Sequence, residues 1–387
     1  MERRGYYGLK YGGQYVSESL ITALKEVENE FEFVAHDGCY TNEVDFFLYR
    51  YSGRKTPLYQ CRRLSKECDG ADIYLKREDL GVWESSLFNF IAGQVIIGKR
   101  IGRKQVITAA PNLIFAQSVA SCASAMGLGC KIFMGDKDYH KAGVEVLRLK
   151  ALHAEVIVVN SNNSEDGSFY EAKEASKALF EKEATISMYV EHSAIGPHPY
   201  PKMVTKLATV VGEEIKEQFS TTIEGVIPVE NEGKLPDLVV CSLGTGASTL
   251  GVFTVFEETN VELVGVESID YSIMNHGTLG IHQGMCSLFM QDEEDNPVSS
   301  SMGAYPGVEP KHVALKESKR VVYEMVSKEE AKEAFKQLAT LEGILPSYED
   351  SLALAYAIKR AKNMAYEQNI VVTLTGKADK AWLKECE

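Results

Sequence analysis

The sequence lacks paired cysteines, long apolar runs and an excess of positive charge. The longest apolar runs, such as residues 237–243, are much shorter than a membrane span. No two cysteines form a C-x-x-C pair, and their scatter favours reduced thiols over a zinc site or a disulfide framework. The eight cysteines are Cys39, Cys61, Cys68, Cys122, Cys130, Cys241, Cys286 and Cys386.

The beginning of the sequence and its overall charge exclude further classes of protein. Residues 1–16 contain no apolar stretch of the kind that a secretory signal needs, so we expect a cytoplasmic location. The formal net charge of -14 argues against nucleic acid or an anionic membrane as a partner. We therefore expect the partners to be small molecules or other proteins.

Short β-branched runs alternate with longer segments of helical periodicity along the 387 residues. This alternation predicts an α/β fold with parallel sheets covered by helices, and the length favours two domains. The acidic and then serine-rich residues 291–301 are expected to form a loop. The expected strands are 106–108, 130–134, 155–159, 237–243, 261–267 and 370–374, and the expected helices are 116–126, 141–152, 171–182, 202–218, 328–341 and 348–364.

Several motifs along the chain resemble one enzyme family. Residues 74–94 read YLKREDLGVWESSLFNFIAGQ, and residues 196–201 read GPHPYP. Further matches lie at residues 11–16, 56–59, 212–216, 305–308, 342–344 and 379–380. In this order and spacing they resemble the tryptophan synthase beta chain, a pyridoxal-phosphate enzyme of fold type II.

The resemblance implies two α/β domains with parallel twisted sheets flanked by helices. The N-terminal, mobile domain would contain residues 53–204. The C-terminal domain would combine residues 1–52 with 205–387, and a ligand cleft would lie between the two. The resemblance also implies a homodimer, and it leaves open an alpha-subunit-like protein or a beta chain as a partner.

The resemblance fails at the residues that carry the family's chemistry. The lysine that holds the cofactor covalently corresponds to Leu87, which has no nitrogen. The catalytic glutamate corresponds to Ala109. The arginine–aspartate pair that closes the family's active site corresponds to Lys141 and Ala304. We therefore expect no covalently bound cofactor.

The family's phosphate-binding turn is better preserved. Its counterpart is Gly244-Thr245-Gly246-Ala247-Ser248, between an expected strand and a helix. Glycine N–H groups at a helix N-terminus suit a phosphate or another anion, although a tight turn alone also needs glycine. The turn thus leaves open non-covalent binding of phosphate or pyridoxal phosphate.

Four other side chains are candidates in the same account. Glu267 corresponds to a glutamate near the cofactor ring, and Thr375 to a serine that bonds the pyridine nitrogen. Each is equally compatible with a loop role. His282 and Glu267 are a weak candidate pair for unrelated acid–base chemistry. Lys76 is expected to serve in an ion pair or to face solvent.

Three functions follow from these observations. The first is a degenerate relative that acts as a binding or regulatory partner, without condensing indole and serine. The second is a repurposed enzyme that acts on an anionic metabolite in the altered cleft. The third is conventional tryptophan synthase activity, a pyridoxal-phosphate-dependent lyase reaction, carried by another lysine.

Overall fold

The computed structural model divides the chain into two compact units. It describes residues 4–34, 37–160, 169–220, 223–224, 227–228, 234–244, 246–298 and 305–387. The first unit comprises Met1–Gly53, Leu87–Leu207 and His276–Ala314, and the second comprises Arg54–Ser86, Ala208–Asn275 and Leu315–Glu387. The expected division into residues 53–204 and residues 1–52 plus 205–387 stays a prediction, and the compact units divide the chain at other positions.

The second unit is built on a six-stranded sheet in the order β15-β12-β11-β16-β4-β3. All neighbouring strands are parallel except β3, which pairs antiparallel with β4. The strands are β3 (Leu58–Gln60), β4 (Asp72–Arg77), β11 (Leu238–Ser242), β12 (Glu262–Ser268), β15 (Val322–Val326) and β16 (Asn369–Leu374). A separate antiparallel pair joins β9 (Ile223–Glu224) to β10 (Ile227–Pro228).

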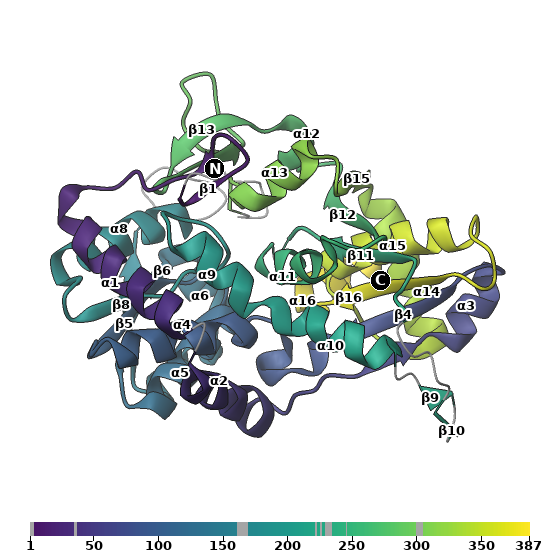
Figure 1. Cartoon of the computed structure of the whole chain (residues 1–387), viewed down its shortest axis with the longest axis horizontal. Coiled ribbons are helices and arrows are strands. Elements are labelled where there is room, and N and C mark those ends of the chain that lie inside the picture. Colours follow the sequence, from purple (N-terminus) through teal and green to yellow (C-terminus); the bar gives the residue numbers. More distant parts are fainter. Residues whose placement is uncertain are drawn as a thin grey trace. The chain divides into compact units, whose positions relative to one another are not determined.

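The residues of strand β4 alternate between the two faces of the sheet. Ile73 and Leu75 are fully buried in the core that the sheet shares with α3, α14 and α15. These three helices are labelled in Figure 1. Tyr74 and Lys76 alternate with them and point to the opposite face. There the Tyr74 ring meets Phe219 of α10, and the Lys76 amine meets Glu214 of the same helix. A charged residue in a buried strand is therefore paired across to a helix.

Helices of the second unit carry clear local start and stop signals. Ser327 and Glu330 form a reciprocal capping box at the start of α14, and Gly343 ends that helix in a left-handed conformation. Helices α15 and α16 begin at Ser347 and Asp379, whose side chains accept backbone hydrogen bonds. The helical segments are α3 (Arg62–Cys68), η2 (Glu78–Leu80), η3 (Val82–Glu84), α10 (Thr209–Ser220), α11 (Ala247–Phe256), α14 (Lys328–Glu342), α15 (Tyr348–Ala361) and α16 (Lys380–Cys386).

The first unit contains a four-stranded parallel sheet in the order β7-β6-β5-β8. Its strands are β5 (Gln105–Ala109), β6 (Gly129–Gly135), β7 (Ala154–Val159) and β8 (Ser187–Tyr189). Helix α8 packs on β5 and β6, while α4 packs on α5 and β8 (Figure 1). A mixed-length antiparallel sheet of β1 (Tyr6–Tyr7), β2 (Tyr11–Gly12), β14 (Met285–Phe289) and β13 (Thr278–His282) completes this unit.

The helices of the first unit surround its parallel sheet. They are α1 (Glu18–Val34), α2 (Gly38–Asp45), the π-helix η1 (Phe46–Tyr51), α4 (Phe88–Arg100), α5 (Leu113–Met126), α6 (Asp136–Ala142), η4 (Gly143–Glu145), α7 (Val146–Ala151), α8 (Phe169–Glu183) and α9 (Tyr200–Leu207). Helices α12 (Ile273–His276) and α13 (Pro310–Glu317) span positions where the chain passes from one unit to the other.

The predicted α/β fold class is confirmed, with parallel sheets flanked by helices. Each expected strand is present. The helix expected over 202–218 is two helices, α9 and α10, and the one expected over 141–152 is broken near Gly143. Among the residues described above, no helix is long and apolar enough to cross a membrane.

Candidate functional site

Three of the predicted site positions lie at one edge of the second unit's sheet. Strands β12, β11 and β16 are parallel neighbours, so their carboxyl ends share an edge. Glu267 lies near the end of β12, Gly244 follows β11 and Thr375 follows β16. Ligand sites of α/β sheets lie at this edge, which is where the resemblance puts the anion-binding turn.

A carboxylate side chain packs directly against the first glycine of that turn. A Cβ atom at position 244 would overlap with the Cβ and Cγ atoms of Glu349, which belongs to the first turn of α15. Burial raises the pKa of Glu349, and the nearby Asp379 carboxylate adds to the increase. When ionised, a carboxyl side chain at this glycine disfavours a phosphate in the same place.

The other described residues of the turn make hydrogen bonds or are buried within the second unit. The Gly246 N–H donates to the Leu243 carbonyl, and the buried Ser248 and Ser86 hydroxyl oxygens lie 2.8 Å apart. Ala247 begins α11 and is fully buried. Thr245, the remaining predicted member, lies outside the described residues.

The vacated catalytic positions are apolar in the structure. Leu87 is 8% exposed, and its carbonyl oxygen accepts a hydrogen bond from the Ile91 N–H as α4 begins. Ala109 is the buried last residue of β5. Ala304 lies outside the described residues. At Leu87 and Ala109, therefore, no side chain can form a covalent bond with a ligand or transfer a proton.

The Thr375 hydroxyl already has a partner in its own unit. It donates to Asp350 Oδ1 at 2.9 Å, while the Thr375 and Gly376 N–H groups donate to Asp350 Oδ2 at 2.8 and 3.0 Å. Desolvation raises the pKa of Asp350 to about 7 despite these hydrogen bonds. The proposed contact of Thr375 with a cofactor ring would compete with this buried carboxyl.

The Glu267 side chain accepts hydrogen bonds at the N-terminus of α12. Its carboxylate accepts hydrogen bonds from the Ser272 hydroxyl and from the Ile273 and Met274 N–H groups. Desolvation raises the pKa of Glu267. These contacts give Glu267 a structural role that the sequence analysis considered only as the alternative.

The suggested pairing of His282 with Glu267 stays a prediction, because the two residues belong to different units. His282 belongs to the first unit, where its Nε2 lies 3.0 Å from Gln291 Nε2 and its ring packs edge-on against Phe289. Desolvation lowers the pKa of His282. Glu267 belongs to the second unit and is occupied by the start of α12. Each residue is thus explained by contacts within its own unit.

A polar cluster that was not predicted from the sequence lies at the corresponding edge of the first unit's sheet. Glu191 and His192 follow β8, and the Lys173 amine of α8 lies 2.9 Å from Glu191 Oε2. The available signal was a glutamate–histidine pair directly after a buried strand. Its lysine partner is 18 residues earlier, so sequence spacing alone does not join them.

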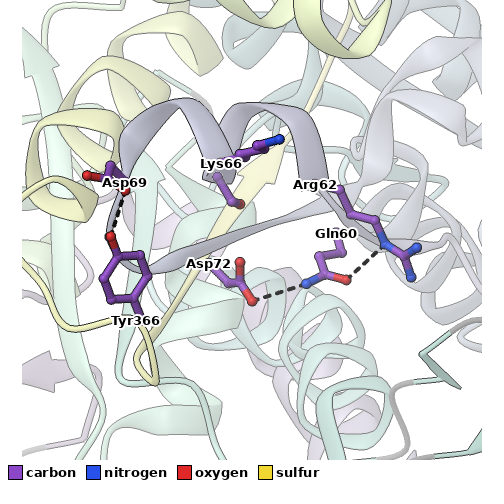
Figure 2. Close-up of a pocket in the computed structure, with 8 residues that line it drawn as sticks. Gln60, Arg62, Lys66, Asp69, Asp72 and Tyr366 are labelled. Atoms are coloured by element: carbon purple, nitrogen blue, oxygen red, sulfur yellow. Dashed lines mark hydrogen bonds between the residues drawn. The ribbon is translucent and has the colours of Figure 1, made fainter.

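A solvent-open hollow of about 590 Å³ lies elsewhere in the second unit. Figure 2 shows Gln60 between Asp72 and Arg62, with contacts of 3.1 and 3.4 Å, and Tyr366 bonded to Asp69 at 2.6 Å. Asp72 is the first residue of β4, so this hollow lies toward the amino end of that strand and away from the edge with Gly244. Its lining residues are Gln60, Arg62, Ser65, Lys66, Asp69, Gly70, Asp72 and Tyr366.

Comparison with known proteins agrees with the fold described here. Residues 49–376 match the family described as Pyridoxal-phosphate dependent enzyme, and the chain belongs to this family. The structure is similar to the processed form of threonine deaminase isoform 2 from Solanum lycopersicum, with a TM-score of 0.66 and 18% identity, covering 100% of this chain and 92% of that one.

A second solved structure is similar over slightly less of the chain. It is a fungal L-serine ammonia-lyase from Rhizomucor miehei, with a TM-score of 0.64 and 18% identity, covering 86% of this chain and 96% of that one. At this level of identity, both likenesses establish the fold.

The residues at the family's positions do not fit pyridoxal phosphate held as the resemblance implies. Leu87 offers no amine, Glu349 packs on the glycine that would approach the phosphate, and the Thr375 hydroxyl is bonded to Asp350. The described residues also contain no group of three or more His, Cys, Asp and Glu side chains that could hold a metal ion. Any chemistry of this chain would therefore depend on other side chains.

Proposed function

We propose that this protein is a tryptophan synthase beta-like member of the family that has lost covalent use of the cofactor. In this proposal it does not condense indole with serine, and it acts as a binding or regulatory partner. The main supporting observations are made within each unit separately: Leu87 stands at the position of the lysine in the first unit, and the carboxyl side chain of Glu349 packs against Gly244 in the second.

A second copy of the same chain is the partner that we propose. Exposed aromatic side chains gather on one short segment, with Phe46 58%, Tyr49 36% and Tyr51 44% exposed. Exposed apolar groups of this size are unusual on a monomeric surface when they lie together. A homodimer that uses η1 would cover them, and sedimentation velocity on wild-type protein and a Phe46→Ser variant tests this.

The competing function is a conventional lyase, as the names of the two similar structures suggest. It would require a lysine other than the residue at position 87 to hold the cofactor. The first experiment separates the two functions. Purified protein is incubated with excess pyridoxal phosphate, desalted, examined for visible absorbance, treated with borohydride and mapped by peptide mass spectrometry.

We expect no retained absorbance and no tryptophan formed from indole and serine. A Leu87→Lys variant is expected to remain inactive, because the Glu349 carboxylate still lies at the glycine turn. Stoichiometric cofactor retention together with serine-dependent tryptophan formation in the wild-type protein would refute the proposal.

A further inference from the structure

The polar cluster at the carboxyl edge of the first unit's sheet combines groups from two elements. Lys173 and Lys177 lie one turn apart on α8, while Glu191 and His192 follow β8. The Lys173 amine is 2.9 Å from Glu191 Oε2 and 3.5 Å from His192 Nδ1. Lys177 lies 3.5 Å from the other Glu191 oxygen. One carboxylate thus faces two amines and an imidazole.

Aromatic rings enclose this cluster. The Lys173 amine lies 4.7 Å from the centre of the Tyr305 ring and 6.0 Å from that of Phe169. Phe115, Phe169 and Tyr305 each pack edge-on against the His192 ring. The buried Tyr305 hydroxyl has no hydrogen-bond partner among the described residues. A buried hydroxyl without a partner is costly, and it can donate to a ligand that enters.

The members of this cluster differ in their exposure to solvent. The side chains of Lys173 and Glu191 are each 1% exposed, whereas Lys177 is 23% and His192 12% exposed. Lys177 and His192 therefore mark the entrance, and Lys173 lies at the inner end. A small molecule that arrives along this route meets a cation first and the buried amine second.

Burial also changes the pKa of the Lys173 amine. Desolvation is the main cause that lowers the pKa of Lys173 to about 7, and the nearby Lys177 charge acts in the same direction against the Glu191 carboxylate. Desolvation and the two lysines also lower the pKa of His192 well below its usual range. Near neutral pH a large fraction of the Lys173 amine is therefore unprotonated and nucleophilic.

We propose that Lys173 captures a small 2-oxo carboxylate by forming an imine with its carbonyl carbon. Lys173 is the only amine within hydrogen-bond distance of Glu191 Oε2 among the described residues, and Lys177 stands at the entrance to pair with the ligand's carboxylate. The aromatic walls suit a short apolar substituent. This site goes beyond the regulatory role proposed above.

The reaction is balanced without any oxidant or reductant. The Lys173 nitrogen lone pair forms a bond to the carbonyl carbon, and the carbonyl π electrons move to oxygen, which takes up a proton from solvent. Glu191 accepts a proton from the attacking nitrogen and passes it to the departing oxygen. The carbon–oxygen bond then breaks, water leaves with these two protons, and the nitrogen lone pair completes the carbon–nitrogen double bond of a protonated imine.

Reductive trapping with pyruvate tests the proposal on the full chain. The protein is incubated with pyruvate and cyanoborohydride, digested and mapped for carboxyethyl-lysine by mass spectrometry. We expect the adduct at Lys173 with at least about tenfold higher occupancy than at any other lysine. Lys76, which is also fully buried but lies in the second unit, is the internal control and should remain unmodified.

Two variants separate reactivity from folding. Lys173→Arg retains a cation and should fold, but it should show no adduct in the peptide that contains position 173. Lys177→Met should reduce trapping of pyruvate severalfold more than trapping of acetaldehyde, which has no carboxylate and reports only the change in Lys173 reactivity that follows from losing the Lys177 charge.

An adduct spread evenly over surface lysines, or none at Lys173 in folded wild-type protein, would overturn the inference. So would equal losses of pyruvate and acetaldehyde trapping in Lys177→Met, because Lys177 would then not recognise the carboxylate. The indole–serine assay does not involve Lys173, so either proposal can fail while the other survives.

Discussion

The two buried lysines of this chain, Lys76 in the second unit and Lys173 in the first, have opposite surroundings. The Lys76 amine donates to Glu214 at 2.6 Å, to the Thr56 carbonyl at 2.7 Å and to Gln218 at 2.8 Å. All three of its N–H donors are therefore matched. Lys173 has one carboxylate at 2.9 Å, an imidazole at 3.5 Å and aromatic rings.

This difference distinguishes a structural lysine from a reactive one. Arg54 bonds both Glu78 and Glu214, so Lys76 belongs to a network of two cations and two carboxylates. In the Lys173 cluster, two lysines share one carboxylate. Burial is the main cause that lowers the pKa of both amines, but only Lys76 has three hydrogen-bond acceptors that favour its charged form.

The largest expected effect tests the structural side of this comparison. Replacing Glu214 with Gln removes the carboxylate that Arg54 and Lys76 share, and should lower the free energy of unfolding by about 3–5 kcal/mol. The matched control on the same helix is Glu217→Gln, whose exposed partner is Lys55. Its expected loss is within about 1 kcal/mol. Urea titrations of the variants measure both, and equal losses would contradict the comparison.

The next prediction concerns the pH dependence of stability caused by Lys173. Its folded-state pKa of about 7 is below the usual 10.5, so between these values the unfolded chain binds more protons. Stability should therefore rise with pH from about 7 to 10.5, by about 1.4 kcal/mol for each unit that this single group contributes.

A Lys173→Met variant should lack this rise, which is measured as the difference between wild-type and variant unfolding at several pH values. The facing charged groups Glu191, Lys177 and His192 remain in both proteins, so the difference isolates the lysine. Parallel stability curves for the two proteins would exclude a depressed pKa at Lys173.

Asp350 in the second unit should give a pH effect of the opposite sign. Its folded-state pKa of about 7 is above the usual 3.8, so the folded chain binds more protons between these values. Stability should fall as pH rises from about 4 to 7, over a slightly narrower range than for Lys173.

An Asp350→Asn variant keeps an oxygen for the Thr375 and Gly376 N–H groups but does not titrate. Relative to this variant, the wild-type protein should lose stability across that range in thermal unfolding at graded pH. A constant difference between the two proteins would show that Asp350 is ionised throughout.

The smallest expected effect is the loss of a helix cap, which can be compared with the loss of a buried carboxylate. Ser327→Ala removes the side chain that caps α14 and should cost about 1 kcal/mol. Urea unfolding compares it with Ser318→Ala, which removes a hydroxyl beyond the end of α13 and should change stability less. A loss as large as that of Glu214→Gln would mean that the ion network is not exceptional.

The sequence predicted the regular elements better than their interruptions. Strands β5 (QVITA) and β16 (NIVVTL) consist mostly of apolar and β-branched residues, which suit a buried parallel strand. The break between α9 and α10 falls inside a continuous helical periodicity. Strand β4 was not predicted, because Lys76 interrupts its apolar pattern and only its partner on α10 makes that charge tolerable.

The candidate site was predictable where it depends on sequence order. The loss of an amine at Leu87 and the position of the glycine turn both follow from aligned motifs. The approach of Glu349 to Gly244 joins residues far apart in the chain, and no local pattern indicates it. The same holds for Lys173 and Glu191, which meet only because α8 packs across the sheet that ends in β8.

The packing of Glu349 on Gly244 also has a consequence for protein engineering. An amine introduced at position 87 would leave the Glu349 side chain in place on the glycine turn. A design that aims at covalent cofactor binding should therefore vary positions 87 and 349 together, and the two single variants show what each position contributes.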